Sequence, residues 1–173
     1  MNISKTLITK EQIAEKVRKL AARINADYNG AELVVIGILN GSFIFTADLI
    51  RELELDIKVE FMGVSSYKDG TKSSGELLIT KDLQLDITAA DVLIVEDIID
   101  SGATAKLLVE TLKSRSPHSV KVCSLLNKQA RRVNDFRADY VGFEIDDEFV
   151  VGYGLDFAGK FRQLKEIKIL EEV

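Results

Sequence analysis

The sequence predicts an α/β protein with a mostly parallel, doubly wound sheet flanked by helices. Short apolar runs of strand length alternate along the chain with amphipathic helical segments, which is the pattern of repeated strand–helix–strand units. The run Leu33–Leu39 is continuously apolar, as expected of a strand that is covered on both faces. The chain has 173 residues, of which 46% are hydrophobic and 29% charged. That length and composition suit a single domain over residues 1–173.

Each element is indicated by its own local pattern. Thr9 and Gln12 form a potential capping box, and apolar residues then recur at helical spacing from Ile13 to Tyr28, before Asn29 and Gly30 end the helix. Two further helices are expected, over residues 43–53 and 104–114. Strands are expected at 33–39, 57–62, 77–79, 92–95, 120–126, 140–145 and 149–151, with a short edge strand at 167–170.

Between two of these strands lies a segment with almost nothing to bury. Residues 65–75, which include Ser66 and Tyr67, are rich in Gly, Ser, Thr, Lys and Asp. A polar loop of about ten residues inside a compact domain is commonly functional. We therefore expect a mobile loop here.

Composition excludes several classes of protein. The one cysteine, Cys123, can form neither an internal disulfide nor a multi-thiolate metal site, and its apolar surroundings favour a buried thiol. A signal-peptide pattern and an apolar run of roughly 18 residues are both missing, so we expect a cytoplasmic protein without a membrane span. The net charge of −5 argues against a nucleic-acid surface. A small anionic substrate remains compatible with it, because a few local donors can reverse the field inside one cleft.

The segment from Val92 to Thr104 carries the chemistry. Ligands of open α/β sheets bind beyond the carboxyl ends of the strands, where this segment is expected to lie. Asp100–Thr104 combines backbone amides, a glycine, two hydroxyls and a helix N-terminus, which can hold a phosphate. Glu96 and Asp97 are acceptors when ionised, which suits a ribose diol or a metal that bridges it. In the alternative interpretation, Asp100 and Ser101 only cap the helix, and the two acids are a solvated strand end.

This string resembles the motif with which type I phosphoribosyltransferases bind 5-phosphoribosyl 1-diphosphate (PRPP). Other blocks are similar to those of the hypoxanthine-guanine phosphoribosyltransferases, in the same order along the chain. They are residues 39–43 (LNGSF), Ser66-Tyr67, Leu126-Asn127-Lys128, and 149–156 (FVVGYGLD) through Phe161-Arg162. The resemblance covers roughly residues 36–164, and the last block is specific to enzymes for 6-oxopurines.

The resemblance implies a fold with a small hood, formed by the N-terminal segment and the region from about residue 140, and a loop at Ser66 and Tyr67 that covers the site. It also implies a homodimer or homotetramer. The site would require Mg²⁺, held by Glu96, Asp97 and Asp156. The ribose 5-phosphate would be held by Glu96, Asp97, Asp100, Ser101, Gly102, Ala103 and Thr104.

Further roles are implied at matching positions. Asp100 would be the general acid/base at purine N7. Lys128 would donate to the 6-oxo group, Phe149 would stack on the purine, Val150 would offer main-chain groups and Asp156 would complete the purine site. The diphosphate would contact Asn40, Gly41 and Arg162, whose planar guanidinium suits phosphate oxygens. Asn40 departs from the pattern, because many relatives have lysine there, so any ion pair made by that lysine is lost.

The implied reaction is purine salvage: hypoxanthine or guanine reacts with PRPP to give IMP or GMP and diphosphate. Within enzymes, the alternative is a phosphoribosyltransferase for xanthine or another base. From a different class, the alternative is a non-catalytic regulator that senses PRPP. Lys128 and the 149–156 block favour a 6-oxopurine enzyme, and the acidic charge balance argues against a DNA-binding regulator.

Overall fold

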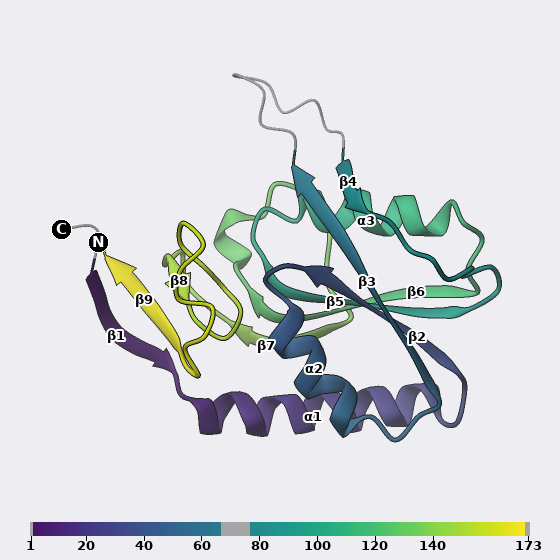
Figure 1. Cartoon of the computed structure of the whole chain (residues 1–173), viewed down its shortest axis with the longest axis horizontal. Coiled ribbons are helices and arrows are strands. Elements are labelled where there is room, and N and C mark those ends of the chain that lie inside the picture. The colour runs from purple at the N-terminus through teal and green to yellow at the C-terminus, as the bar shows by residue number, and fades with distance from the viewer. Residues whose placement is uncertain (1, 67–76, 172–173) are drawn as a thin grey trace.

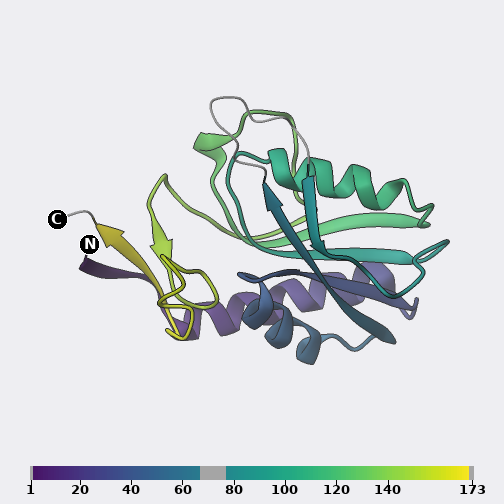
Figure 2. The ribbon, with the colours of Figure 1, turned by 45° about the horizontal axis from the view of Figure 1, so that its top comes forward.

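The computed structural model describes residues 2–66 and 77–171, and it contains two sheets and three α-helices in these ranges. Helices α1 and α2 lie on one side of the large sheet and α3 lies on the other, as Figures 1 and 2 show. The elements are β1 (Asn2–Ile8), α1 (Lys10–Tyr28), β2 (Leu33–Leu39), α2 (Phe43–Glu52), β3 (Ile57–Ser66), β4 (Leu77–Lys81), β5 (Asp91–Ile99), α3 (Ala103–Lys113), β6 (Ser119–Asn127), the 3-10 turn η1 (Gln129–Arg131), β7 (Tyr140–Glu144), β8 (Val150–Val151) and β9 (Ile167–Glu171).

The large sheet has six strands in the order β4-β3-β2-β5-β6-β7. All neighbours in it are parallel except β3 and β4, which pair antiparallel. The order reverses direction between β2 and β5, because the chain adds strands outward from β2 and then returns to β5. Such a switch point is where open α/β sheets bind ligands. The predicted mostly parallel, doubly wound sheet is confirmed.

Two apolar layers enclose the large sheet. One layer packs residues of α1 and α2, such as Leu20 and Phe45, against the face that includes Leu33 and Leu93. The other packs Leu108 and its neighbours on α3 against the opposite face. Alternate residues of one strand therefore belong to different layers, which explains why the runs in β2 and β5 are apolar at every position.

The first helix begins as its sequence predicts. Thr9 accepts a hydrogen bond from the backbone N–H of Gln12 at 3.2 Å, and the Gln12 side chain accepts from the Thr9 backbone N–H at 2.8 Å. This reciprocal pair is a capping box. The helix is followed by Asn29 and Gly30, both with positive φ. In the described residues, no helix is both long and apolar enough to span a bilayer.

The small sheet has the order β1-β9-β8, and both of its pairings are antiparallel. It lies at one end of the large sheet, with the first and last described strands side by side (Figure 1). Strand β1 was not predicted. The strand expected at 167–170 is confirmed as β9, but it is the central strand of this sheet rather than an edge strand.

Two expected boundaries also require correction. The hood was expected to include the chain from about residue 140, but Tyr140–Glu144 pairs with β6 in the large sheet. The strand expected at 92–95 continues to Ile99, because β5 keeps its pairing with β6 through Ile99 and Asn127. Glu96 and Asp97 therefore lie on a strand rather than after it. Of the expected mobile loop, Ser65 and Ser66 end β3, and residues 67–75, including Tyr67, lie outside the described residues.

Candidate active site

A cavity of about 270 Å³ opens at the carboxyl ends of β2 and β5. Its lining includes seven residues that the sequence singled out: Gly41, Glu96, Asp97, Asp100, Ser101, Gly102 and Thr104. Ala103 is exposed at the start of α3 and lies outside this lining. The two halves of the motif, the paired acids and the loop that enters α3, thus face one space.

The two acids on β5 are held in a low-dielectric setting. Glu96 is only 8% exposed. Burial raises the pKa of Glu96 well above its usual range, and the neighbouring Asp97 raises it further. Burial raises the pKa of Asp97 to about 6, although the backbone N–H of Ile98, which donates to Asp97 Oδ1 at 2.8 Å, lowers it. Two adjacent carboxylates, one buried and one half-buried, favour a cation, or donors supplied by a ligand.

The loop after β5 has the form of an anion site. Gly102 has φ +80° and precedes the first residue of α3, and Thr104 and Ala105 of the first helical turn line the cavity. The backbone amides at the start of a helix have no partners within it, which suits an anion. The Ser101 hydroxyl accepts a hydrogen bond from the backbone N–H of Ala103 at 3.3 Å. Any side chain at residue 102 would collide with Arg132, whose Nη1 would lie 2.5 Å from the added β-carbon. Only glycine therefore allows both the left-handed turn and the close packing of Arg132.

The segment after β6 is tied to the end of β5. The backbone N–H of Lys128 donates to the carbonyl of Ile99 at 2.9 Å, and that of Val133 donates to the carbonyl of Ser101 at 3.0 Å. Lys128 is only 6% exposed, and its Nζ lies 3.6 Å from Asp147 Oδ1. The buried lysine is thus held beside the acidic loop by backbone hydrogen bonds.

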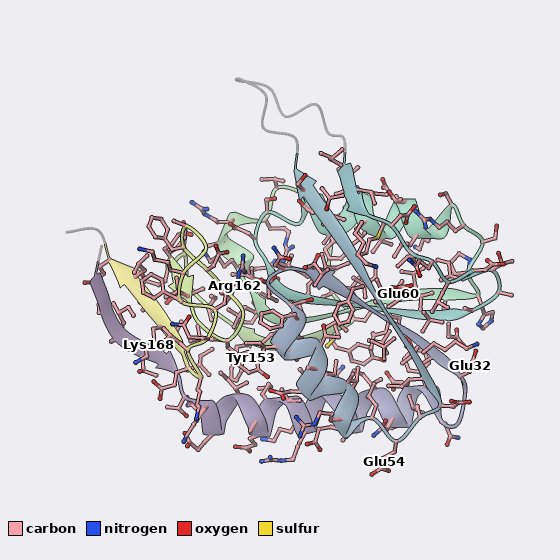
Figure 3. All side chains as sticks on the ribbon, viewed as in Figure 1. Glu32, Glu54, Glu60, Tyr153, Arg162 and Lys168 are labelled. Carbon is pink, nitrogen blue, oxygen red and sulfur yellow. The ribbon has the colours of Figure 1, made fainter. Side chains whose placement is uncertain are left out.

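The third part of the site is the connection between β8 and β9. Figure 3 shows Tyr153 and Arg162 on this connection, on the side of the small sheet that faces the large one. The Tyr153 hydroxyl donates to Asp48 Oδ2 at 2.5 Å, which joins the connection to α2. Arg162 donates from Nη1 to the carbonyl of Gly154 at 2.6 Å and pairs through Nη2 with Asp156 Oδ1 at 2.8 Å. Asp156 Oδ2 accepts from the backbone N–H of Gly159 at 2.8 Å, so both of its oxygens are engaged.

The loop after β2 packs directly under these two regions. A β-carbon at Gly41 would overlap Asp97 Oδ2, and one at Gly154 would overlap the carbonyl oxygen of Gly41. Asn40 is exposed and follows a cis peptide bond from Leu39. Arg162 and Asp156 are also close enough to Asp97 to alter its pKa, the first downward and the second upward. The predicted diphosphate residues therefore lie together beside the acids.

The predicted purine-binding residues lie in two places. Lys128 adjoins the acidic loop, whereas Phe149 and Val150 belong to β8 and its approach. Phe149 is 51% exposed and meets Phe157 edge to face, with 5.7 Å between the ring centroids. Val150 is buried and pairs with Ile169 of β9. An aromatic ring left half exposed at this point is available to stack on a ligand.

The sequence interpretation missed two charged residues. Arg131 Nη1 lies 3.3 Å from Asp100 Oδ2, and Arg131 Nε lies 2.8 Å from Asp147 Oδ1. Neither Arg131 nor Asp147 is assigned a role from the sequence. Nothing in the local pattern marks either residue, because their partners are 31 and 16 positions away along the chain.

The fold and this cavity define a transferase of phosphoribosyl groups. A phosphoribosyl transferase domain model matches residues 4–158. The chain belongs to the phosphoribosyltransferase family. It is 45% identical to a hypoxanthine-guanine phosphoribosyltransferase of Bacillus subtilis over 98% of this chain and 94% of that protein. It is 46% identical to the Aquifex aeolicus protein of the same name over 97% of this chain and 95% of that protein.

Solved structures of that kind share the fold. A crystal structure of a hypoxanthine-guanine phosphoribosyltransferase from Bacillus anthracis, with a HEPES molecule in its active site, aligns with a TM-score of 0.95. It is 46% identical and covers 98% of this chain and 100% of that chain. A hypoxanthine phosphoribosyltransferase of Staphylococcus aureus aligns with a TM-score of 0.94 at 45% identity, covering 98% of this chain and 92% of that one.

Proposed function

We propose that this protein is a purine salvage enzyme that converts hypoxanthine or guanine, with PRPP, to IMP or GMP and diphosphate. The single observation that carries the proposal is the cavity at the end of β5. It combines the buried Glu96 and the half-buried Asp97 with the anion-binding turn that enters α3. The relatives of similar length that carry this enzyme name support the choice among phosphoribosyltransferases.

PRPP binding follows from the two halves of the cavity. The 5-phosphate binds the amides and hydroxyls of Ser101–Thr104, where the positive end of the α3 dipole adds to the attraction. The ribose hydroxyls donate to the carboxylates of Glu96 and Asp97. The diphosphate lies over the main chain of Asn40 and Gly41 and contacts Arg162, which exchanges part of its pairing with Asp156 for phosphate oxygens.

Mg²⁺ suits this donor set. Mg²⁺ commonly binds one or two protein carboxylates and completes its shell with water and substrate phosphates. In the described residues no group of three or more metal-ligating side chains is present, so substrate oxygens would supply the remaining ligands. Glu96 and Asp97, with raised pKa values, would gain the positive charge that their burial demands. Mg²⁺ would neutralise the diphosphate as it leaves; Asp156 is a further candidate ligand.

The base is recognised by groups of opposite polarity. Lys128 donates to the 6-oxo oxygen, Phe149 stacks on the ring and the main chain of Val150 meets the 2-position edge. Asp100 Oδ1 is buried and has no hydrogen-bond donor among the described residues. A proton from purine N7 would complete that acceptor while N9 bonds to the ribose carbon, so Asp100 acts as the general base.

Initial rates test the proposal. PRPP and Mg²⁺ are supplied with hypoxanthine, guanine, xanthine, adenine and a pyrimidine base in turn, and diphosphate release is measured. Turnover of hypoxanthine or guanine well above the others is expected. Preference for xanthine or a pyrimidine would favour the alternative enzymes, and PRPP binding without turnover of any base would favour a regulator.

We further propose that the protein is cytoplasmic and forms a homodimer or homotetramer. Light scattering of the purified protein tests the oligomeric state.

A further inference from the structure

Arg131 lies at the centre of a chain of four charges. Its guanidinium contacts Asp100 Oδ2 through Nη1 at 3.3 Å and Asp147 Oδ1 through Nε at 2.8 Å. The same oxygen of Asp147 lies 3.6 Å from Lys128 Nζ. This series of ion pairs, Asp100–Arg131–Asp147–Lys128, therefore connects the proposed proton acceptor Asp100 to Lys128, the lysine proposed to recognise the purine. Charges alternate along it, so each contact is attractive.

The Asp100 carboxylate has little else to hold it. Among the described residues, Arg131 is the only side chain that pairs with it, and Oδ1 is without a donor. A carboxylate on a loop rotates freely unless a partner fixes its plane. A guanidinium on one oxygen leaves the second oxygen in a defined direction, which is what proton transfer at one ligand atom requires.

Arg131 is itself well anchored. It ends the turn η1, whose start is fixed by the hydrogen bond from Lys128 N–H to the Ile99 carbonyl. The ion pairs with Asp100 and Asp147 raise the pKa of Arg131, so it stays a cation over the working pH range. Asp147 comes from the connection between β7 and β8 and holds the guanidinium from the other side.

We propose that Arg131 is a positioning residue that orients the Asp100 carboxylate for proton exchange with the base. This inference rests on the proposed function. Asp147 holds the Arg131 guanidinium in place and also contacts Lys128. Binding of the purine to Lys128 and orientation of the Asp100 carboxylate are therefore coupled through this shared residue. In this proposal Arg131 acts through Asp100 and not by direct contact with PRPP or the base.

The test compares Arg131→Gln and Arg131→Lys with wild type. The Arg131 side chain is 53% exposed, and exposed ion pairs add little to folding, so the melting temperature should change by no more than about 2 °C. We expect Arg131→Gln to lower kcat roughly tenfold while KM for PRPP stays within about twofold. Arg131→Lys keeps a cation on the same backbone and should recover part of kcat.

The matched control is Arg115→Gln. Arg115 pairs with Asp82 at 2.8 Å, away from the cavity lining, so its loss should leave both kcat and KM unchanged. A structural effect shared by all broken ion pairs would appear in both variants. An effect on orientation would appear only at Arg131.

A double-mutant cycle decides whether Arg131 acts through Asp100. If it does, Asp100→Asn combined with Arg131→Gln should be no slower than Asp100→Asn alone. Multiplied losses would overturn the inference, as would unchanged kcat in Arg131→Gln. Wild-type turnover is read separately: a wild type inactive on all 6-oxopurines would overturn the proposed function and this inference together, whereas an active wild type with an unaffected variant would overturn the inference alone.

Discussion

The Cα atom of Gly41 lies so close to Asp97 that a β-carbon at residue 41 would overlap the carboxylate oxygen Oδ2. The loop after β2 and the acid on β5 therefore interlock without any side chain between them. Gly41 is required here by space rather than by backbone conformation, since its φ is not in the left-handed region.

Gly41→Ala should consequently displace Asp97 and the loop together. We expect PRPP affinity to fall at least tenfold, because both the proposed diol and diphosphate contacts move. Isothermal titration with PRPP and Mg²⁺ measures this. The control is Gly30→Ala, where the added carbon meets nothing within 4 Å but φ is +83°. Gly30→Ala should lose stability and keep its affinity for PRPP. Equal PRPP affinity in the two variants would mean that Gly41 is not part of the PRPP site.

Asp100→Asn removes the proposed proton acceptor and replaces it with an amide of nearly the same size and shape. An asparagine oxygen still accepts from Arg131, but it cannot take a proton at neutral pH. We expect kcat to fall roughly 10²-fold or more, with PRPP binding largely intact. Steady-state rates and PRPP titration together test this. Near-normal turnover would remove Asp100 from the acid/base role.

Lys128→Met should change the choice of base. Hypoxanthine offers an acceptor at its 6-position and adenine a donor, so a buried lysine facing adenine would oppose donor to donor, at about 1–3 kcal/mol or more. Wild type should therefore use adenine very poorly. Lys128→Met should lose activity on hypoxanthine, which narrows the preference for hypoxanthine over adenine. Wild-type activity on adenine equal to that on hypoxanthine would contradict the assignment of Lys128.

The raised pKa of Asp97 gives the ligand-free protein a pH-dependent stability. Burial sets this pKa at about 6, above its unfolded value. Between about pH 4 and pH 6 the folded protein binds more protons at Asp97 than the unfolded chain does, so the contribution of Asp97 to the free energy of unfolding falls as pH rises through that window and levels off above it. Glu96, whose pKa is also raised, continues the fall at higher pH.

Asp97→Asn removes this titration. At pH 8 the ligand-free variant should be more stable than wild type by roughly 1–3 kcal/mol, and the difference should shrink toward pH 4. Urea unfolding across this pH range provides the measurement. Asp135→Asn is the control, because it removes a carboxylate whose side chain is 93% exposed. If the stability difference between Asp97→Asn and wild type did not depend on pH, the charge on Asp97 would not be what destabilises the folded protein.

Local patterns predicted the large sheet well because its elements are determined locally. The capping box of α1 and the doubly covered runs of β2 and β5 are visible within a few residues. The motif around Asp100 was also found, because its acids, glycine and hydroxyls are consecutive. Its boundary was misplaced since Glu96 and Asp97 are polar residues on a strand, where pairing with β6 overrides their low strand propensity.

Features that depend on distant partners were not predictable in this way. Strand β1 alternates weakly and is held by β9, which pairs Asn2 with Glu171. The ion pair between Arg131 and Asp100 joins residues that are far apart in sequence. The same applies to the hydrogen bond between Tyr153 and Asp48, which joins positions 105 residues apart. Such contacts exist only after the chain has closed into its tertiary fold.

The position of β9 between β1 and β8 sets an order for assembly during synthesis. Neither outer strand has a sheet partner until β9 leaves the ribosome, whereas all six strands of the large sheet precede it in the chain. Closing a pairing that spans most of the chain is slow compared with local pairing. Phe149, whose carbonyl accepts from Leu170 N–H at 2.8 Å, is fixed only at that step. A nascent chain would thus acquire the proposed 5-phosphate and ribose contacts, together with Lys128, before the position of Phe149 is fixed.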